Sequence, residues 1–208
     1  MKKSKRIKKS NSWKIKQHRD QFFKKSKTLG YRSRASFKLI ELNKKYKFLK
    51  KNTNLLDLGS FPGEWSQVAS QIIRAGRIMS IDIKNMDPIK DVRFFKGDIL
   101  SNETKSAVIK YFKSNLDVIL SDMAADTTGN KSLDSIRTNQ LCADVINFSK
   151  ETLKPKGVLV SKIFMGEDFL EVKNLAKSTF NKVNFFKPKS SRKESKETYL
   201  HCEILKTL

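Results

Sequence analysis

The chain has 208 residues, of which 38% are hydrophobic and 31% are charged, and its formal net charge is +23. This length fits one domain with an attached arm better than two domains, and the hydrophobic content excludes a wholly disordered chain. No stretch approaches the roughly 20 apolar residues of a membrane span, and no apolar segment follows Met1 as in a secretory signal, so we expect a cytoplasmic protein.

The positive charge is concentrated near the N-terminus, where residues 1–34 hold fourteen Lys or Arg against one acid, Asp20. Because cations set against phosphates release condensed counterions, this segment predicts a nucleic-acid partner; the alternative is a Lys-rich solvated surface. The segment shows no sustained hydrophobic period, which indicates an arm over 1–32, flexible or ordered only by docking, and a domain over 33–208. Four aromatic side chains of the arm could stack on bases or pack onto the domain: Trp13, Phe22, Phe23 and Tyr31.

Beyond the arm, hydrophobic periodicity predicts strands that alternate with helices. The helices are expected over 33–52, 64–74, 102–112, 133–153 and 167–180. The strands are expected over 54–59, 77–83, 92–96, 116–121, 157–164, 182–186 and 197–205. This alternation predicts an α/β fold with a mostly parallel sheet and helices on both faces, because parallel neighbours need a crossover. No helix separates the last two strands, so we expect them to form an antiparallel hairpin.

The turn after the first strand points to a cationic cofactor. Gly59 lets the chain leave the strand sharply, and Gly63 allows backbone and ligand to approach each other closely. Their spacing fits neither the dinucleotide fingerprint G-x-G-x-x-G nor a P-loop. Asp57 at the strand end would repel a pyrophosphate but suits a cation. S-adenosylmethionine, which carries an ammonium and a sulfonium, meets this requirement.

Two further acids follow the next two strands. Asp82 ends the second strand, where a carboxylate can accept from both ribose hydroxyls, and Asp98 follows the third, where it could accept from an adenine amino group. Either residue alone could equally be a turn or strand-end cap. Acids at the ends of three consecutive strands, beside the glycine turn, favour the cofactor interpretation.

Methylation of a ribose 2'-hydroxyl needs a group that removes its proton, and a lysine can do so only if its pKa is lowered by desolvation or a nearby cation. Lys162 interrupts the apolar strand over 157–164 and is the first candidate; otherwise it is a lysine that reaches out to solvent. Lys38 is enclosed by apolar neighbours, although a lysine on a helix face is ordinary. Asp122 ends the fourth strand and Glu197 begins the last; their alternatives are a turn aspartate and a surface glutamate.

Together these residues resemble the FtsJ (RrmJ, heat-shock) type of 2'-O-ribose methyltransferases of bacterial large-subunit rRNA, from about residue 12 to the C-terminus. The matching motifs are Asp57-Leu58-Gly59-x-x-Pro62-Gly63-x-Trp65-Ser66-Gln67, Met86-Asp87-Pro88, Gly97-Asp98, Ser121-Asp122-Met123-Ala124 and the segment 191–199. The resemblance implies a Rossmann-like, seven-stranded fold, with S-adenosylmethionine as cofactor and a uridine ribose of 23S rRNA, on the assembled 50S subunit, as acceptor. A tRNA or cap ribose remains an alternative acceptor. The other alternative is a non-catalytic RNA-binding assembly factor, which the loss of a catalytic residue would indicate.

The resemblance also assigns the site. The catalytic tetrad falls on Lys38, Asp122, Lys162 and Glu197, with Lys162 as general base and Lys38 either as the second cation or as a holder of the ribose. The cofactor-binding candidates are Asp57, Gly59, Pro62, Gly63, Trp65, Asp82, Asp98 and Asp122, so Asp122 would face both cofactor and acceptor. Cys142 and Cys202 show no metal-ligand spacing, so we expect no metal and no disulfide. We also expect a monomer.

Three details depart from the family pattern. Glu64 stands where a second glycine is common, Ser60-Phe61 replaces a pair of alanines, and Ala125-Asp126 replaces a frequent proline. These departures concern cofactor affinity and the acceptor loop, not the reaction class. Base methylation is disfavoured, because neither Cys has a nucleophile setting and no Asn/Asp-Pro-Pro-Tyr/Phe turn occurs.

Overall fold

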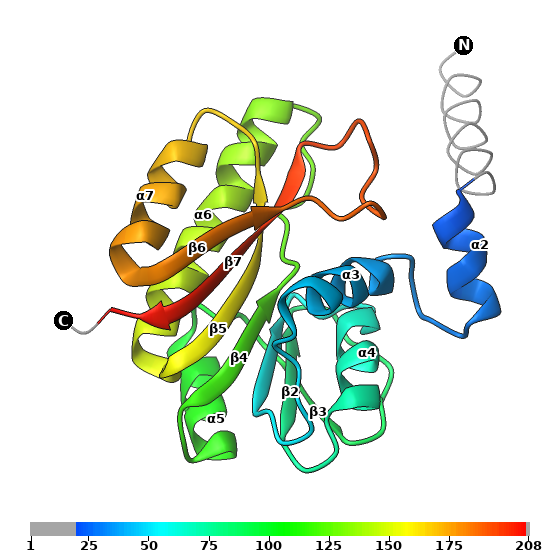
Figure 1. Cartoon of the computed structure of the whole chain (residues 1–208), viewed down its shortest axis with the longest axis vertical. Helices are drawn as coiled ribbons and strands as arrows, with labels where there is room; N and C mark the ends of the chain where they lie inside the picture. Colours follow the sequence, from blue (N-terminus) through cyan, green and yellow to red (C-terminus); the bar gives the residue numbers. More distant parts are fainter. Residues whose placement is uncertain (1–19, 207–208) are drawn as a thin grey trace.

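A seven-stranded sheet runs through the part of the chain that the computed structural model describes, residues 20–206 (Figure 1). The order of strands across it is β3-β2-β1-β4-β5-β7-β6. Neighbours from β3 to β5 are parallel, whereas β7 is antiparallel to both β5 and β6. The predicted Rossmann-like, mostly parallel sheet with its C-terminal antiparallel hairpin is therefore confirmed. The strands are β1 (Leu55–Leu58), β2 (Ile78–Asp82), β3 (Val92–Lys96), β4 (Leu116–Ser121), β5 (Leu153–Phe164), β6 (Phe180–Phe186) and β7 (Glu197–Leu205).

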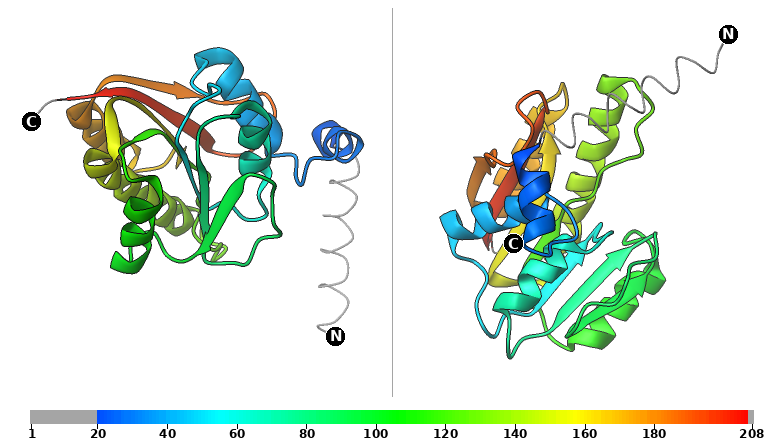
Figure 2. Two further views of the ribbon diagram at one scale, coloured as in Figure 1. Left: turned by 90° about the horizontal axis from the view of Figure 1, so that it is seen from below. Right: turned by 90° about the vertical axis from the view of Figure 1, so that its right-hand side faces the viewer.

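Helices cover both faces of the sheet, as predicted. One face packs against α3 (Ser36–Tyr46) and α4 (Glu64–Ile72). The other packs against α5 (Asn102–Phe112), α6 (Lys131–Thr152) and α7 (Phe169–Thr179). Figure 2 shows the two groups on opposite sides of the strands. None of the helices between residues 20 and 206 is long and apolar enough to span a membrane.

The two cores follow from the alternation of side chains along each strand. Successive residues of a strand point to opposite faces of the sheet. In β1, Leu55 belongs to the core under α3 and α4, whereas Leu56 belongs to the core under α5, α6 and α7. Likewise Val160 and Tyr199 lie on the α3–α4 face. Lys162 and Glu197 lie two positions from them along the same strands, so their side chains point to this face as well.

A short helix, α2 (Gln21–Thr28), lies in the predicted arm and was not expected from the sequence. The Asp20 side chain caps it by accepting from the backbone N–H groups of Phe22 and Phe23. The Phe22 ring lies 5.6 Å from that of Phe37 on α3. An isolated helix of eight residues is too short to be stable in water, so docking rather than propensity stabilises this helix. Trp13 and the rest of the arm over 1–19 lie outside the described residues.

Two boundaries differ from the sequence prediction by four residues or more. Helix α3 ends at Tyr46 rather than near residue 52, because Lys47 adopts a left-handed conformation with φ of 55°. Strand β5 begins at Leu153 rather than at residue 157, although Pro155 lacks an N–H. The register between β4 and β5 shifts just there, so the ladder is irregular where the proline stands.

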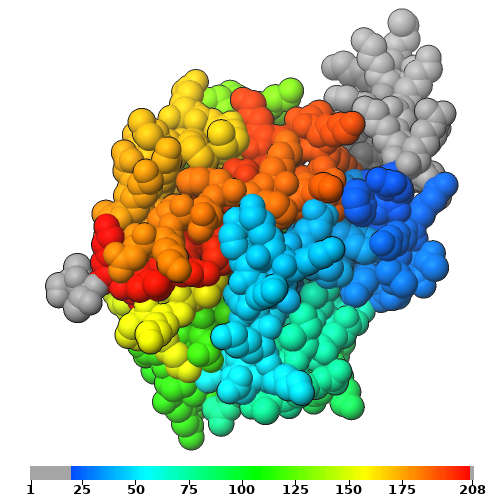
Figure 3. Space-filling model, viewed as in Figure 1, coloured from blue at the N-terminus to red at the C-terminus, as the bar shows by residue number. Residues whose placement is uncertain are grey.

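The carboxyl ends of the central strands meet beside the start of β7. Residues paired across β5 and β7 include Lys162 with Tyr199 and Phe164 with Glu197. Paired residues of antiparallel strands point to the same face, so the Lys162 and Tyr199 side chains both face α3. Asp122 directly follows β4, the strand beside β5. In the space-filling view α3 lies between α4 and the C-terminal hairpin, so it covers this end of the sheet (Figure 3).

Candidate active site

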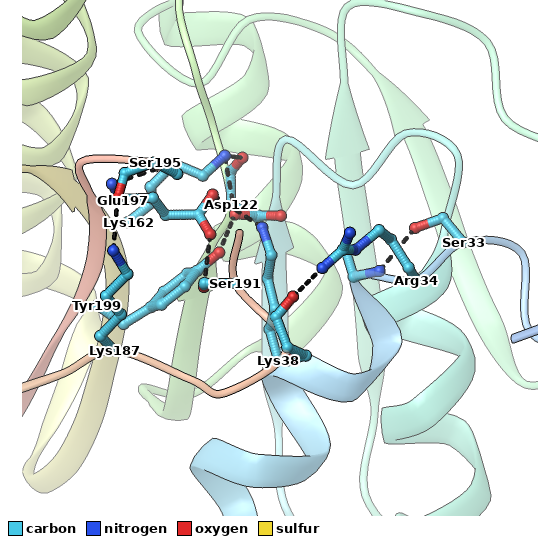
Figure 4. Close-up of polar contacts among 12 residues, drawn as sticks. Ser33, Arg34, Lys38, Asp122, Lys162, Lys187, Ser191, Ser195, Glu197 and Tyr199 are labelled. Atoms are coloured by element: carbon cyan, nitrogen blue, oxygen red, sulfur yellow. Dashed lines mark hydrogen bonds and ion pairs between the residues drawn. The ribbon is translucent and has the colours of Figure 1, made fainter. Parts of the chain in front are cut away.

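The four residues of the expected tetrad converge at this end of the sheet (Figure 4). The Lys162 ammonium lies 2.8 Å from Oδ1 of Asp122 and also donates to the backbone carbonyl of Asp122 at 2.6 Å. Lys162 is only 8% exposed, so the alternative of a lysine extended into solvent is excluded. The Tyr199 hydroxyl donates to the same carboxylate oxygen at 2.7 Å.

A second ion pair lies next to the first. Lys38 Nζ donates to Glu197 Oε2 at 2.8 Å, and the Ser191 hydroxyl donates to the other carboxylate oxygen, also at 2.8 Å. Lys38 Nζ lies 5.7 Å from the centre of the Tyr199 ring. Each carboxylate is thus fixed by one lysine and one hydroxyl group, and the Tyr199 ring connects the two pairs.

The electrostatic environment fixes the charge of three of these groups. Burial lowers the pKa of Lys38, but the carboxylates of Asp122 and Glu197 outweigh burial, so this pKa is raised overall and Lys38 stays a cation. Burial raises the pKa of Asp122, yet the charges of Lys162 and Lys38 outweigh it, so Asp122 stays ionised. Burial raises the pKa of Tyr199 well above its usual value, and its hydroxyl remains a donor.

A cavity of about 630 Å³ opens beside the tetrad, at the ends of β1, β2 and β4. Four of the expected cofactor-binding residues line it: Gly59, Asp82, Asp98 and Asp122. Its walls also contain the exposed apolar side chains Phe61, Ile83 and Leu100. A cavity with apolar walls and acids at its edge can enclose a planar base and bind polar hydroxyl and amino groups.

Asp82 and Asp98 also stabilise the turns that form this cavity. Asp82 accepts from the backbone N–H groups of Phe61 and Lys84 at 2.9 and 2.8 Å. Asp98 accepts from the N–H of Leu100 at 3.0 Å. Both acids therefore combine the turn-cap role, which the sequence left as an alternative, with a position on the cavity wall.

The remaining cofactor-binding candidates, Asp57, Pro62, Gly63 and Trp65, are not among the residues that line the cavity. Trp65 is buried under α3 and donates from Nε1 to the carbonyl of Ala35 at 3.0 Å. Gly63 has a φ of 108°, and a Cβ there would meet the Arg32 guanidinium, which donates to the carbonyl of Pro62. At Gly59 a Cβ would lie 2.9 Å from Cα of Met123, so this position requires glycine for packing against the loop after β4.

Asp57 is fully buried beneath the turn, where it accepts from the Ser66 hydroxyl. Burial is the main cause that raises its pKa to about 8; the Ser66 bonds oppose this shift, and the nearby carboxylates of Glu64 and Asp122 add to it. At neutral pH Asp57 is therefore mostly an uncharged acid. The sequence predicted a carboxylate at this place, but its charge depends on what binds next to it.

We expect Asp57→Asn to stabilise the protein at high pH. A carboxyl whose pKa is raised on folding holds a proton that the unfolded chain has released, so wild-type stability falls as the pH rises from about 4 to 8. The uncharged amide avoids this loss, and its melting temperature should exceed that of the wild type by about 5 °C or more at pH 8.5 but match it at about pH 4. Differential scanning fluorimetry without ligand measures both. The exposed Asp87→Asn serves as the control; equal shifts at the two pH values would contradict the assignment.

Two residues of the site were missed by sequence reasoning. Tyr199 lies two positions after Glu197 on β7, so strand alternation alone places both on one face, and this signal was available. Glu64, at the start of α4, was noted only as a departure from the family pattern. It is buried, and its carboxylate faces Asp122 and Lys38, which no sequence periodicity indicates.

Among residues 20–206, no group of three or more His, Cys, Asp or Glu is arranged to hold a metal ion. Cys142 and Cys202 are both buried and unpaired in the core under α6 and α7.

Comparison with known proteins identifies relatives over almost the whole chain. A family model described as FtsJ-like methyltransferase matches residues 31–204. "Ribosomal RNA large subunit methyltransferase E" of Pelagibacter ubique is 46% identical over 197 residues, which cover 95% of this chain and 97% of that protein.

Solved structures agree with this match. A crystal structure named as a ribosomal RNA methyltransferase from Plasmodium falciparum is 34% identical, with a TM-score of 0.75, and covers 84% of this chain and 98% of that one. Human methyltransferase-like protein 13 in complex with S-adenosylhomocysteine (SAH) is 15% identical, with a TM-score of 0.58, and covers 81% of this chain and 79% of that one. This last likeness concerns the fold alone.

Proposed function

Because this chain belongs to the FtsJ-like methyltransferase family, we propose that it transfers a methyl group from S-adenosylmethionine to the 2'-hydroxyl of a uridine ribose in large-subunit rRNA. The observation that carries the proposal is the convergence of Lys38, Asp122, Lys162 and Glu197 beside the cavity. All four polar groups are in place, which disfavours a non-catalytic RNA-binding protein. We expect the chain to act as a cytoplasmic monomer.

The donor set of the cavity fits S-adenosylmethionine. Asp82 and Asp98 on the wall suit the ribose hydroxyls and the adenine amino group, and the apolar side chains beside them suit the adenine ring. Glu64 does not line the cavity, but one of its buried carboxylate oxygens lacks a hydrogen-bond partner within residues 20–206, and this oxygen suits a nearby cation. When bound, S-adenosylmethionine supplies a methyl group activated by the positive charge on its sulfur.

The tetrad activates the acceptor. Lys162 serves as the general base that takes the proton of the ribose hydroxyl, and the Asp122 carboxylate and carbonyl hold its amine in place. Lys38 keeps its positive charge and stabilises the oxygen on which negative charge develops. Glu197, which accepts from the Ser191 hydroxyl, fixes Lys38, and Tyr199 fixes Asp122. The two lysines therefore have different roles: one must lose a proton and the other must keep it.

A rim of cations suits the RNA backbone. Arg34 donates to the carbonyl of Ser190 in the loop between β6 and β7, which links this loop to the start of α3. Arg34 also pairs with the carboxylate of Asp20. Burial, and after it repulsion from Arg192, lower the pKa of Arg34, against the opposing effect of Glu197 and Glu194. The same loop carries Lys187, Lys189, Arg192, Lys193 and Lys196. A polyanion would relieve this repulsion.

Methyl transfer to defined acceptors tests the function. The chain is incubated with labelled S-adenosylmethionine and, separately, with assembled 50S subunits, naked 23S rRNA and tRNA, all lacking 2'-O-methylation. We expect the 50S subunit to be labelled, and we expect the label to map to the 2'-oxygen of one uridine. Label in a base, or in tRNA alone, would refute the proposal.

The basic arm is proposed to clamp phosphates. Removing residues 1–19 takes away nine Lys or Arg and no acid but leaves α2 intact. We expect rRNA binding to weaken at least about tenfold at low salt, and the slope of log affinity against log salt to become shallower by about three or more. Fluorescence anisotropy over a salt series measures this. Cofactor affinity should not change, and an unaltered slope would show that the arm contacts no phosphates.

A further inference from the structure

Glu64 is a buried carboxylate that the tetrad mechanism does not use. It is the first residue of α4, it follows Gly63, and it is only 8% exposed. Its backbone N–H and the Ser33 hydroxyl donate to the carboxylate, but Oε2 has no partner among residues 20–206. Burying a charged oxygen without a partner is costly. Such an atom indicates that a ligand completes the site.

The two lysines of the tetrad are already engaged. Lys162 is bonded to Asp122, and Lys38 is bonded to Glu197. Within residues 20–206, neither Asp57 nor Glu64 forms an ion pair of its own. The titratable groups that face Glu64 come from α3, β1, the end of β4 and β7: Lys38, Asp57, Asp122 and Tyr199.

The surroundings of Glu64 and Asp57 disfavour the ionised form of both carboxyl groups. Burial raises the pKa of Glu64 to about 7, and the negative charge of Asp122 opposes the effect of the hydrogen bonds and of Lys38. Asp57 is affected in the same way and more strongly. A cation bound between these carboxylates would favour their ionised forms.

We propose that Glu64 provides the counter-charge for the sulfonium of S-adenosylmethionine and thereby distinguishes this donor from S-adenosylhomocysteine, whose sulfur is neutral. The inference rests on the proposed function. The transferred methyl has to touch the oxygen that Lys162 deprotonates, so the sulfonium has to bind beside the tetrad. The carboxylate of Glu64 interacts electrostatically with two members of that tetrad, Lys38 and Asp122. The glycine common at this position in the family carries no such charge.

Because the donor sulfur is charged and the product sulfur is neutral, Glu64 stabilises the bound donor more than the bound product. In the transfer, a carbon–oxygen bond forms, the electron pair of the carbon–sulfur bond stays on sulfur, and the hydroxyl proton passes to Lys162. The sulfur is then neutral and Glu64 loses its counter-ion. The residue therefore favours binding of the donor and release of the product.

Calorimetric binding of both ligands to the full-length protein, in the absence of RNA, tests this. For the wild type between pH 6.0 and 7.5, affinity for S-adenosylmethionine should rise about fivefold as Glu64 ionises, since only the ionised form pairs with the cation. Affinity for S-adenosylhomocysteine should change less than about twofold. Glu64→Gln should remove the pH dependence and lower the preference for the donor about fivefold at pH 7.5.

Glu103→Gln is the matched control, because Glu103 is an exposed acid in the first turn of α5. It should behave as the wild type does. A Glu64→Gln variant that melts normally and keeps the wild-type pH dependence and ligand preference would overturn the inference while leaving the proposed function intact. An equal pH effect on both ligands would also overturn it, because both carry the ammonium. A wild type that binds neither ligand would refute the proposed function itself.

Discussion

Lys162→Ala is expected to abolish detectable methyl transfer, a loss of about 10³-fold or more, while affinity for S-adenosylmethionine stays within about tenfold. The variant removes the group that accepts the hydroxyl proton, so the effect falls on the transition state. Lys162 is not among the residues that line the cavity, which is why binding of the cofactor should persist. Single-turnover transfer to 50S subunits and calorimetry measure the two quantities.

Lys156→Ala provides the control, because Lys156 lies on the same strand but is exposed and remote from the ion pairs. It should retain wild-type turnover. Since removing Lys162 leaves the buried Asp122 without its ion pair, the melting temperature of the variant has to be recorded as well. A folded Lys162→Ala protein that still turns over would contradict the role of general base.

Arginine substitutions should separate the two lysines. Lys162→Arg is expected to be as inactive as the alanine variant, because a guanidinium cannot accept a proton at neutral pH. Lys38→Arg should keep transfer within about tenfold, since Lys38 acts as a fixed cation, whereas Lys38→Met should lose about 10²-fold or more. Transfer rates at saturating cofactor give the comparison. If the arginine variants behaved in the opposite way, the two roles would have to be exchanged.

Most of the fold could be predicted because its strands are strongly patterned. The apolar runs around Leu56 and Ile119 are buried on both faces of a parallel sheet, and periodicity locates such strands within a few residues. The errors occurred where local conformation or docking decides. Lys47 ends α3 by adopting a left-handed conformation, which a lysine does not predict. Helix α2 is ordered by contact with Phe37.

The site was harder to predict than the fold. The resemblance to the family nominated all four tetrad residues, and the structure brings them together. The resemblance could not distinguish residues that line the cavity from residues that support it. It nominated both Asp82 and Trp65 for cofactor binding, although of the two only Asp82 lines the cavity. Glu64 was not nominated because its significance arises from burial and a missing hydrogen-bond partner, and these depend on other elements of the fold.

The tetrad is distributed from one end of the chain to the other. Lys38 lies on the first helix of the domain, and Glu197 lies eleven residues before the C-terminus. The cavity, in contrast, is built entirely between Leu58 and Asp144. During its own synthesis the polypeptide can therefore complete the walls of the nucleoside pocket before it can complete the catalytic group. Chemical competence is acquired last, when the final strand leaves the exit tunnel and joins the sheet.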